Sequence, residues 1–485
     1  MKILILFLHT LMVVTTVTGQ ELQEQSLSKE DYRQDFIVFR NSLQTSYPSL
    51  YRYVRKKKMN ALLDSCYASL NDETTSLDFY RTIKYLLSAV GDGHLSCRPS
   101  AAIKQYLEEE AALFPLSIHF TGHEAYMLHE LGNGITAGTE IISINNEPVD
   151  RIRQQLFRYM AADGAIETKK YVILNNVFRF YYAFVYGGQN TFSIVFRTAA
   201  GETITRKIHG LPEKDLAVQQ TDTASAKKLL DLQYTRDSIA VLTIKTFSKT
   251  ENSNAGEDLP AFLHTAFSDI TRRNVNRLII DLRGNGGGRD LYGSLLYTYL
   301  ANKKFAWYKS LVTATTGLPF AEFSSTTSSY SDLTPTMLTK TSGHQYAMTA
   351  NAHAGLQYFQ PDANQYKGRV WFLTDGMSFS TTAEFCAIAR SHKRGKFIGT
   401  ETGGAYNGNT SGVQIDTLLP KTGISISFGT VQYNMAVKKV KPANRGVIPD
   451  YPAVPAIENL LQGRDVVYEY ALSLVRTGKH NNGRQ

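Results

Sequence analysis

The chain has 485 residues, of which 43% are hydrophobic and 11% aromatic, so it can bury several cores and does not have the composition of a disordered chain. The net charge is +9, but the basic residues are dispersed, and no motif for nucleic-acid binding occurs. Few cysteines in so long a chain exclude a disulfide-rich scaffold, and no spacing suits a zinc or haem site. The sequence leaves open whether Cys66 pairs with Cys97.

The N-terminus has the pattern of a secretory signal. Lys2 is followed by an apolar run over residues 3–14 and by small residues up to Gly19. The run is shorter than a membrane span usually requires, although an uncleaved anchor is the alternative. We expect residues 1–19 to be removed and the protein to be exported to a bacterial periplasm or outside the cell, with no stable membrane span afterwards.

Residues 20–110 are predicted to be a helical region. Apolar residues recur at helical spacing over residues 31–43. A second helix is expected to start at Ser76, which can serve as a cap, and to end at Gly91, because glycine readily takes the left-handed conformation that closes a helix. The sequence Asp-Gly-His follows directly at residues 92–94.

Residues 111–215 change to short runs typical of β-strands. A glycine turn precedes an apolar run at residues 140–144, and an Asn-Asn pair at residues 145–146 predicts a tight turn into a second strand. This order resembles the central segment of PDZ domains, which bind peptide ends by strand addition at a sheet edge. An unrelated small β-domain is the alternative.

Residues 225–475 alternate between strand and helix patterns and therefore predict an α/β core. The expected strands cover residues 239–244, 277–282, 370–374 and 396–399, and the expected helices cover residues 259–271, 291–300 and a stretch from residue 381 or 382 onward. Residues 304–365 are rich in Ser and Thr and are predicted to be an irregular insertion or lid.

Ser380 is the main candidate for a chemical role. It lies between an apolar run that ends at Thr374 and the start of a helix. A hydroxyl at a helix N-terminus lies near free backbone N–H groups and the positive end of the helix dipole, which is a suitable place for a nucleophile. The alternative is that Ser380 only caps the helix.

A glycine-rich loop follows the expected strand at residues 277–282. Residues 281–288 read Asp-Leu-Arg-Gly-Asn-Gly-Gly-Gly, and glycines there leave backbone N–H groups unshielded and able to hold an anion. A phosphate loop is the next alternative, but its lysine is missing and the spacing does not fit a dinucleotide site. A plain tight turn is a further alternative.

Together these motifs resemble the tail-specific (C-terminal processing) and tricorn-like serine peptidases. The resemblance rests on the strand with Asp-Leu-Arg-x-Asn-x-Gly-Gly, the later Phe-Ser-x-x-x-Glu-Phe around Ser380, the Gly-Thr-Glu-Thr-Gly-Gly of residues 399–404, and residues 446–452 with 463–465. It implies a crotonase/ClpP-like peptidase core, a helical N-terminal region and a PDZ-like domain. The implied partner is a peptide or protein substrate, with no cofactor and no metal.

The resemblance implies Ser380 as the nucleophile, with Ser378 as the neighbouring alternative. The oxyanion donors would be the N–H of Gly287 or Gly288 and the N–H of Thr381. In the tail-specific branch a lysine serves as the base, but its place is taken here by Ala405, and no lysine occurs between Phe397 and Pro420.

The tricorn-like branch uses a histidine from the N-terminal part of the domain, and His94 resembles it. A serine precedes that histidine in tricorn, whereas this chain has Gly93. Asp92 and Glu401 are candidates to orient the imidazole. Asn407 and Asn409 are further residues expected near the site.

The sequence therefore predicts an exported serine peptidase that forms an acyl-enzyme, with His94 as the general base. Two alternatives remain: a peptide-binding module that has lost turnover, and a hydrolase of a non-peptide acyl substrate. The oligomeric state is left open.

Overall fold

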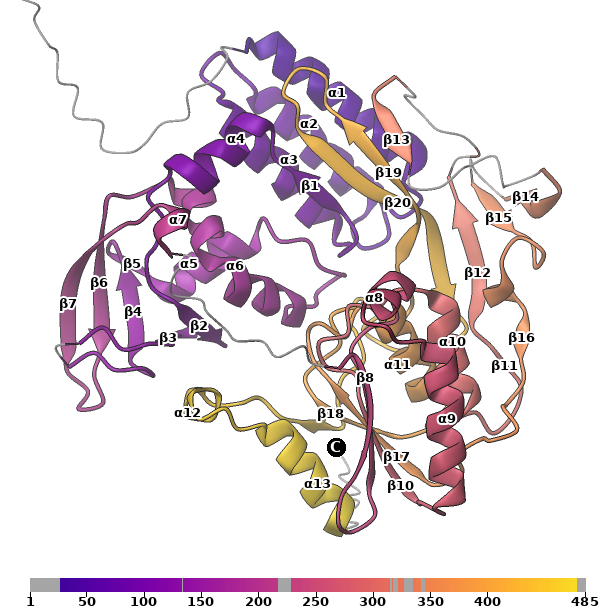
Figure 1. Cartoon of the computed structure of the whole chain (residues 1–485). Coiled ribbons are helices and arrows are strands. Elements are labelled where there is room, and N and C mark those ends of the chain that lie inside the picture. Colours follow the sequence, from indigo (N-terminus) through magenta and orange to yellow (C-terminus); the bar gives the residue numbers. More distant parts are fainter. Residues whose placement is uncertain are drawn as a thin grey trace, which may run out of the picture.

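The structure is a computed structural model that describes residues 27–132, 134–216, 228–314, 316, 322–326, 335–341 and 345–477. The expected signal peptide, residues 1–19, lies outside the described residues. Helices and sheets are mixed throughout, with a helical N-terminal region, as the sequence predicts (Figure 1). Within the described part, Cys66, Cys97 and Cys386 are free thiols, and no helix has the length and hydropathy needed to cross a bilayer.

The N-terminal region packs its helices around one apolar core. A capping box at Ser28 starts α1, and Thr75, not the expected Ser76, caps α3 through a bond from the Asp78 N–H. Gly91 ends α3 with a φ of 77°, as predicted. The helices are α1 (Lys29–Ser46), α2 (Lys56–Ser69), α3 (Ser76–Val90), α4 (Ala101–Gln105) and the π-helix η1 (Tyr106–Glu110).

One short strand in this region departs from the helical prediction. Strand β1 (Ser96–Arg98) pairs antiparallel with β20 (Ser425–Met435), a long strand that extends from the C-terminal part of the chain (Figure 1). Because β1 begins two residues after His94, this pairing carries His94 to the core of the molecule.

Residues 111–215 form a separate sheet in the order β2-β3-β4-β6-β7, with β5 paired to β4. Asn145 and Asn146 have φ values of 50° and 66° and make the predicted turn between β4 and β5. The strands are β2 (Ile118–Thr121), β3 (Glu124–Met127), β4 (Glu140–Ile144), β5 (Glu147–Pro148), β6 (Thr191–Arg197) and β7 (Thr203–His209).

The description of this region as β-type was incomplete, because it also contains helices. These are α5 (Val149–Phe157), α6 (Thr168–Tyr186) and α7 (Glu213–Leu216). Helix α6 is rich in Tyr, Phe and Val, residues that favour strands. Its buried residues include Leu174, Phe178 and Tyr182, which recur every four residues, so tertiary packing selects the helix over the local preference.

The C-terminal part is built on a six-stranded sheet in the order β21-β18-β17-β10-β9-β8. All its pairings are parallel except β8 with β9. Strands β10 and β17 are almost continuously buried because both faces of the sheet are covered. The strands are β8 (Leu230–Tyr234), β9 (Ala240–Ile244), β10 (Arg277–Asp281), β17 (Arg369–Thr374), β18 (Lys396–Gly399) and β21 (Tyr451–Pro452).

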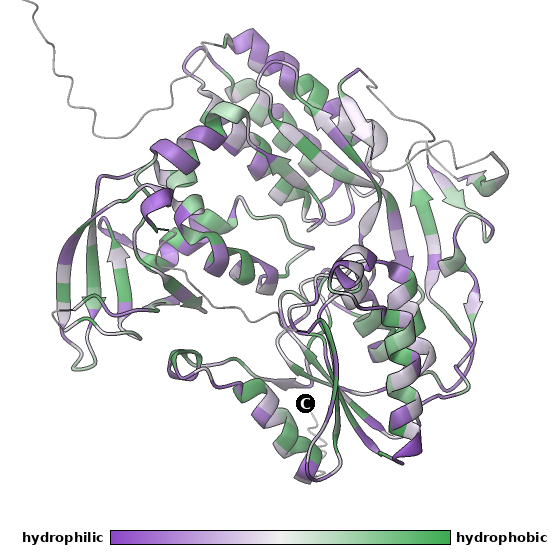
Figure 2. Cartoon of the chain, in the orientation of Figure 1, coloured by the Kyte–Doolittle hydropathy of each residue, from purple (hydrophilic) through white to green (hydrophobic). Residues whose placement is uncertain are grey.

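Helices cover both faces of this sheet. One core joins one face to α9, α10 and α11, and another joins the opposite face to α13. Helix α13 shows hydrophobic and hydrophilic colours along its length, because Val467, Ala471 and Val475 are buried while other residues face water (Figure 2). The helices are α8 (Lys249–Asn254), α9 (Leu259–Arg272), α10 (Asp290–Thr298), α11 (Thr381–Ser391), α12 (Ile457–Leu461) and α13 (Val466–Thr477).

A second sheet joins the C-terminal part to the N-terminal helices. Its order is β13-β19-β20-β12-β15-β14, and β1 also pairs with β20. The prediction that residues 304–365 are irregular was wrong for β12, which lies between β20 and β15. The remaining elements are β11 (Phe305–Ala306), β12 (Tyr308–Thr313), β13 (Ser324–Thr326), η4 (Pro335–Met337), β14 (Leu338–Lys340), β15 (Tyr346–Met348), η5 (Ala354–Leu356), β16 (Tyr358–Phe359) and β19 (Thr410–Leu418).

A buried carboxyl group links α11 to this second sheet. Glu384 is 3% exposed and accepts hydrogen bonds from the Tyr308 hydroxyl (2.8 Å), the Trp307 indole (3.3 Å) and the Asn409 amide (2.7 Å). Burial raises the pKa of Glu384 to about 7, and the charge of Asp290 adds to the rise, although the three donors oppose it.

Since folding raises this pKa from 4.5 to about 7, the folded protein holds a proton here that the unfolded chain releases. We therefore expect stability to fall as the pH rises from about 4.5 to 7, by roughly 2–3 kcal/mol between pH 5 and pH 8. Glu384→Gln should remove this loss, as measured by the difference between wild-type and variant urea unfolding at the two pH values. If the difference in the free energy of unfolding between wild type and Glu384→Gln does not change with pH, the raised pKa of Glu384 is contradicted.

Candidate active site

Ser380 lies at the turn between β17 and α11, in a backbone conformation that a side chain rarely adopts. Its φ is 52° and its ψ is −128°. Such a conformation costs about 1–3 kcal/mol and is found at functional sites. Although Ser380 occupies the N-cap position of α11, its side chain makes no capping bond, so the interpretation of Ser380 as a helix cap is wrong.

His94 contacts the Ser380 hydroxyl from the other end of the chain. Its Nε2 lies 3.1 Å from Ser380 Oγ, although the two residues are 286 positions apart in the sequence. The imidazole packs against the ring of Phe379 with 4.5 Å between ring centroids. The His94 side chain is only 11% exposed, so the pair is largely shielded from water.

Asp92 lies on the opposite side of the imidazole. Its Oδ1 is 3.4 Å from His94 Nδ1, which has no hydrogen-bond partner among the described residues. Oδ1 also accepts the His94 backbone N–H at 2.8 Å. The Tyr47 hydroxyl donates to Asp92 Oδ2 at 2.7 Å. Burial opposes the charge of this carboxylate, but His94 and the Tyr47 hydroxyl hold the pKa of Asp92 below its ordinary value. Asp92 is therefore an anion placed to attract a proton on Nδ1.

Asp163 ties the His94 loop to the C-terminal part of the chain. It is 1% exposed and accepts the Gly93 N–H at 2.6 Å and the Ala405 N–H at 2.8 Å. Burial and the charge of Asp92 raise the pKa of Asp163, while His94, the Gly93 N–H bond and the charge of Lys169 oppose the rise. Ala405, the position expected for a lysine base, thus supplies a backbone donor.

Gly93 has no room for a side chain. A Cβ there would lie 2.8 Å from Lys169 Nζ and 2.9 Å from the Phe379 ring. Lys169 comes from α6, donates to Gly93 O at 2.7 Å, and lies 3.3 Å from the centroid of the Phe379 ring. The serine that precedes the histidine in tricorn would meet both groups here.

The glycine-rich loop lies against Ser380, but only part of it agrees with the predicted oxyanion donors. The Gly287 N–H already donates to Asn285 Oδ1 at 2.9 Å, which argues against Gly287 as a donor to substrate. Within the described residues, neither the Gly288 N–H nor the Thr381 N–H has a hydrogen-bond acceptor. Thr381 Oγ1 donates to Gly288 O at 2.8 Å and holds these two residues together.

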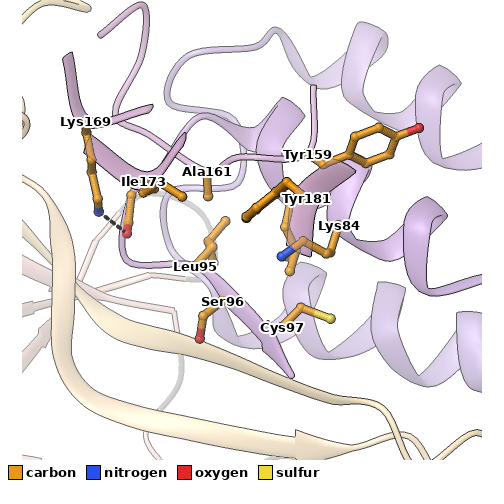
Figure 3. A pocket seen from close by; sticks show the side chains of 11 residues that line it. Lys84, Leu95, Ser96, Cys97, Tyr159, Ala161, Lys169, Ile173 and Tyr181 are labelled. Carbon is orange, nitrogen blue, oxygen red and sulfur yellow. Dashed lines mark hydrogen bonds between the residues drawn. The ribbon is translucent and has the colours of Figure 1, made fainter. Parts of the chain in front are cut away.

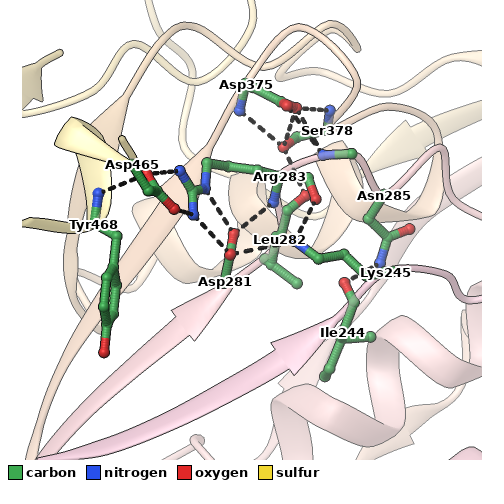
Figure 4. Close-up of polar contacts among 11 residues, drawn as sticks. Ile244, Lys245, Asp281, Leu282, Arg283, Asn285, Asp375, Ser378, Asp465 and Tyr468 are labelled. Atoms are coloured by element: carbon green, nitrogen blue, oxygen red, sulfur yellow. Dashed lines mark hydrogen bonds and ion pairs between the residues drawn. The ribbon is translucent and has the colours of Figure 1, made fainter. Parts of the chain in front are cut away.

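Charged groups anchor the start of this loop (Figure 4). Arg283 pairs with Asp281 at 2.9 Å and with Asp465 at 2.6 Å. Asp375 accepts the Gly284 N–H at 3.0 Å. The alternative nucleophile Ser378 belongs to this anchoring set, because its hydroxyl donates to Leu282 O at 3.0 Å and the residue is fully buried.

The other predicted residues lie in separate contacts. Glu401 accepts two hydrogen bonds from Arg445, at 2.7 and 2.6 Å, and one from the Gly446 N–H at 2.8 Å. Among the described residues, Glu401 has no hydrogen bond with His94. Asn407 donates to Ala443 O at 3.0 Å, and Asn409 donates to Glu384. These contacts indicate that Glu401 has a structural role, and they argue against its orienting the His94 imidazole.

Ligand atoms of Asp92, His94 and Asp163 all lie within 4.8 Å of one another, a spacing that a metal ion can bridge. Both oxygens of Asp163 already accept backbone N–H groups, and Tyr47 donates to Asp92. The cluster is thus arranged for hydrogen bonding. The sequence identified Asp92 and His94 in it but missed Tyr47, Asp163 and Lys169, which no motif marks.

Three solved structures illustrate the matches to this chain, and the match to mature CPAF shows a shared fold. Mature CPAF matches with a TM-score of 0.61 and 13% identity, over 94% of this chain and 99% of that chain. The photosystem II D1 C-terminal processing protease matches with a TM-score of 0.39 and 14% identity, over 90% and 98%. Tricorn protease matches with a TM-score of 0.39 and 15% identity, over 93% of this chain and 37% of its own.

No curated protein sequence matches the chain. The model of peptidase family S41 matches residues 238–453, which carry the glycine-rich loop, Ser380 and the parallel sheet. The CPAF match shows that the fold extends beyond this segment to nearly the whole chain. Residues 238–453 therefore form a domain of peptidase family S41, which classes the protein as a serine-type peptidase.

Proposed function

We propose that the protein is an exported serine peptidase in which His94 acts as the general base for Ser380. The observation that carries this proposal is the 3.1 Å separation of His94 Nε2 and Ser380 Oγ, which is within reach for proton transfer. Among the described residues, no lysine ammonium forms a hydrogen bond with Ser380. Lys169 instead bonds to the carbonyl of Gly93.

The first step is attack by Ser380 on a peptide carbonyl. A neutral His94 with its proton on Nδ1, toward Asp92, leaves Nε2 free to accept the Ser380 proton. As the imidazole becomes charged, the ionised Asp92 stabilises it. The tetrahedral oxyanion would accept the N–H groups of Gly288 and Thr381, each about 3 kcal/mol of transition-state stabilisation in comparable sites.

The second step releases the acyl group. The protonated His94 gives its proton to the leaving amine as the C–N bond breaks, which leaves the acyl-enzyme. A water molecule then attacks the ester carbonyl while His94 Nε2 takes its proton, and His94 returns that proton to Ser380 Oγ as the ester C–O bond breaks and the acid product leaves. The strained backbone of Ser380 supports this assignment, because it holds the hydroxyl away from the helix and toward His94.

We further propose that the sheet of β2 to β7 is PDZ-like and binds a peptide end or controls access to the site. Its order leaves β2 and β7 at the edges, where an extended peptide can add as a strand. Export rests on the signal-like residues 1–19.

A fluorophosphonate probe tests the nucleophile. We expect the wild-type protein to be labelled, Ser380→Ala to take no label, and His94→Ala to react slower by about three orders of magnitude or more, as for other members of catalytic triads. Ser69→Ala, which removes an exposed hydroxyl from the end of α2, is the matched control and should react like wild type. Labelling that persists in Ser380→Ala would falsify the assignment, and peptide binding without any labelling would favour the inactive binding module.

Asp92 and Glu401 can be separated as orienting groups. Asp92→Asn removes the anion next to Nδ1 and should lower kcat by about 10³- to 10⁴-fold with little change in KM. Glu401→Gln should lower the melting temperature, because it weakens the Arg445 contact, while kcat per labelled site stays near wild type. The reverse pattern in kcat would show that Glu401 is the orienting group.

A further inference from the structure

A cavity of about 240 Å³ lies directly beside the loop that carries His94 (Figure 3). Gly93 and Leu95, the two neighbours of His94, form part of its wall. Helices α3 and α6 contribute one lysine each, Lys84 and Lys169, from different sides of the space in Figure 3. The mechanism described above uses neither ammonium group in a proton transfer.

The positive charge of the Lys169 ammonium group is only partly balanced by neighbouring groups. Within the part of the chain that the structure describes, its Nζ has one hydrogen bond, to Gly93 O at 2.7 Å, and it packs on the Phe379 ring. Burial lowers the pKa of Lys169 to about 8, while Asp163 and Asp92 favour its charged form. Neither carboxylate forms an ion pair with it, because Asp163 is bonded to backbone N–H groups and Asp92 faces His94 and Tyr47.

Lys84 is a cation with aromatic neighbours and no carboxylate. Its Nζ lies 5.6 Å from the ring centroid of Tyr80, 5.1 Å from that of Tyr181 and 5.8 Å from that of Phe184. No carboxylate within the described residues forms a salt bridge with it. Lys84 also has side-chain hydrogen bonds with the Tyr181 and Tyr80 hydroxyls. Aromatic rings and neutral hydroxyls stabilise a cation but leave its charge unneutralised.

Lys84 and Lys169 are both half-buried, and neither has an ion pair with a carboxylate among the described residues. Their positive charges are therefore only partly balanced, and an anionic ligand in the cavity can balance them. Leu87, Leu95 and Ile173 supply an apolar surface beside the two cations. Such a wall suits a short apolar stem that ends in a carboxylate, and the space is too small for a folded partner. Because the proposed nucleophile Ser380 is close by, a peptide substrate bound there can place such a carboxylate in the cavity.

We propose that this cavity is a substrate subsite that binds a carboxylate of the peptide, through Lys84 and Lys169. The carboxylate belongs either to an acidic side chain near the cleaved bond or to the C-terminal end of the peptide. The inference rests on the proposed peptidase function, and it adds a preference for substrates that place a carboxylate in this cavity. Lys169 also positions the His94 loop, so Lys84 is the residue that tests the subsite alone.

The experiment compares peptide sets that differ only in charge. One set has amidated ends and carries Glu or Gln at each position in turn, and a second set has no acidic side chain and ends in a free or an amidated carboxyl group. The rates kcat/KM are measured by mass spectrometry for wild type, Lys84→Met and Lys84→Arg. Lys57→Met, which removes the same charge from the exposed start of α2, is the matched control.

We expect wild type to prefer Glu over Gln at one position, or the free over the amidated end, by about tenfold or more, as for other hydrogen bonds to charged groups. Lys84→Met should abolish the preference, whereas Lys84→Arg and Lys57→Met should retain it. The first set identifies a side-chain carboxylate and the second a terminal one. Equal preferences in wild type and Lys84→Met would overturn the proposal.

Binding measurements keep this result separate from the peptidase assignment. Ser380→Ala, alone and combined with Lys84→Met, is titrated with the same peptides, so that no turnover is needed. If wild type neither labels nor cleaves, the peptidase proposal fails, and Lys84-dependent binding of the acidic peptides still supports the subsite. If wild type cleaves but Ser380→Ala binds acidic and neutral peptides equally, the subsite proposal fails.

Discussion

The pairing of β1 with β20 is the constraint on which the site depends. Ser96 pairs with Ser427 and Cys97 with Ile426, and these bonds hold the loop that bears His94 against the domain that bears Ser380. No disulfide assists, since all three cysteines are free. Bringing together groups 286 residues apart costs chain entropy, which the cores around the N-terminal helices and the two large sheets must offset.

Charge balance inside the site is the second constraint. Asp92, Asp163 and Lys169 lie near His94 in a largely buried site, and burial and mutual charge shift the pKa of each of these three groups. Both oxygens of Asp163 accept hydrogen bonds from backbone N–H groups, of Gly93 and of Ala405. Asp163 therefore serves mainly to hold these two segments together, and less to transfer protons. Asp92 keeps one oxygen facing Nδ1, which is the position that a catalytic carboxylate needs. The absence of a side chain at Gly93 is what lets Lys169 enter this cluster.

Much of the parallel core was predictable, because the hydrophobic residues of its buried strands and of the helices that follow them have clear sequence patterns. Strand β18 was predicted with its observed bounds, and α9 within one residue. Helix α6 was missed because its aromatic and β-branched residues favour strands locally. For the same reason Lys169, which lies in α6, was not predicted to be near the site. The β19–β20 hairpin was missed as well, although it is the element that receives β1. Gly287 was a reasonable oxyanion donor from the loop sequence, but the Asn285 side chain takes its N–H.

By itself, the sequence determined the local features of this protein: the strand that ends before Ser380, the glycine-rich loop, the closing glycine of α3 and the lack of a lysine near residue 405. Motifs of this kind depend on neighbours a few residues apart, so spacing is enough to recognise them. Only the tertiary structure decided that His94 meets Ser380, that Asp92 and not Glu401 faces the imidazole, and that Lys84 and Lys169 share one cavity. These contacts join different helices, sheets and loops, and their distances follow from packing and long-range strand pairing, which no local pattern encodes.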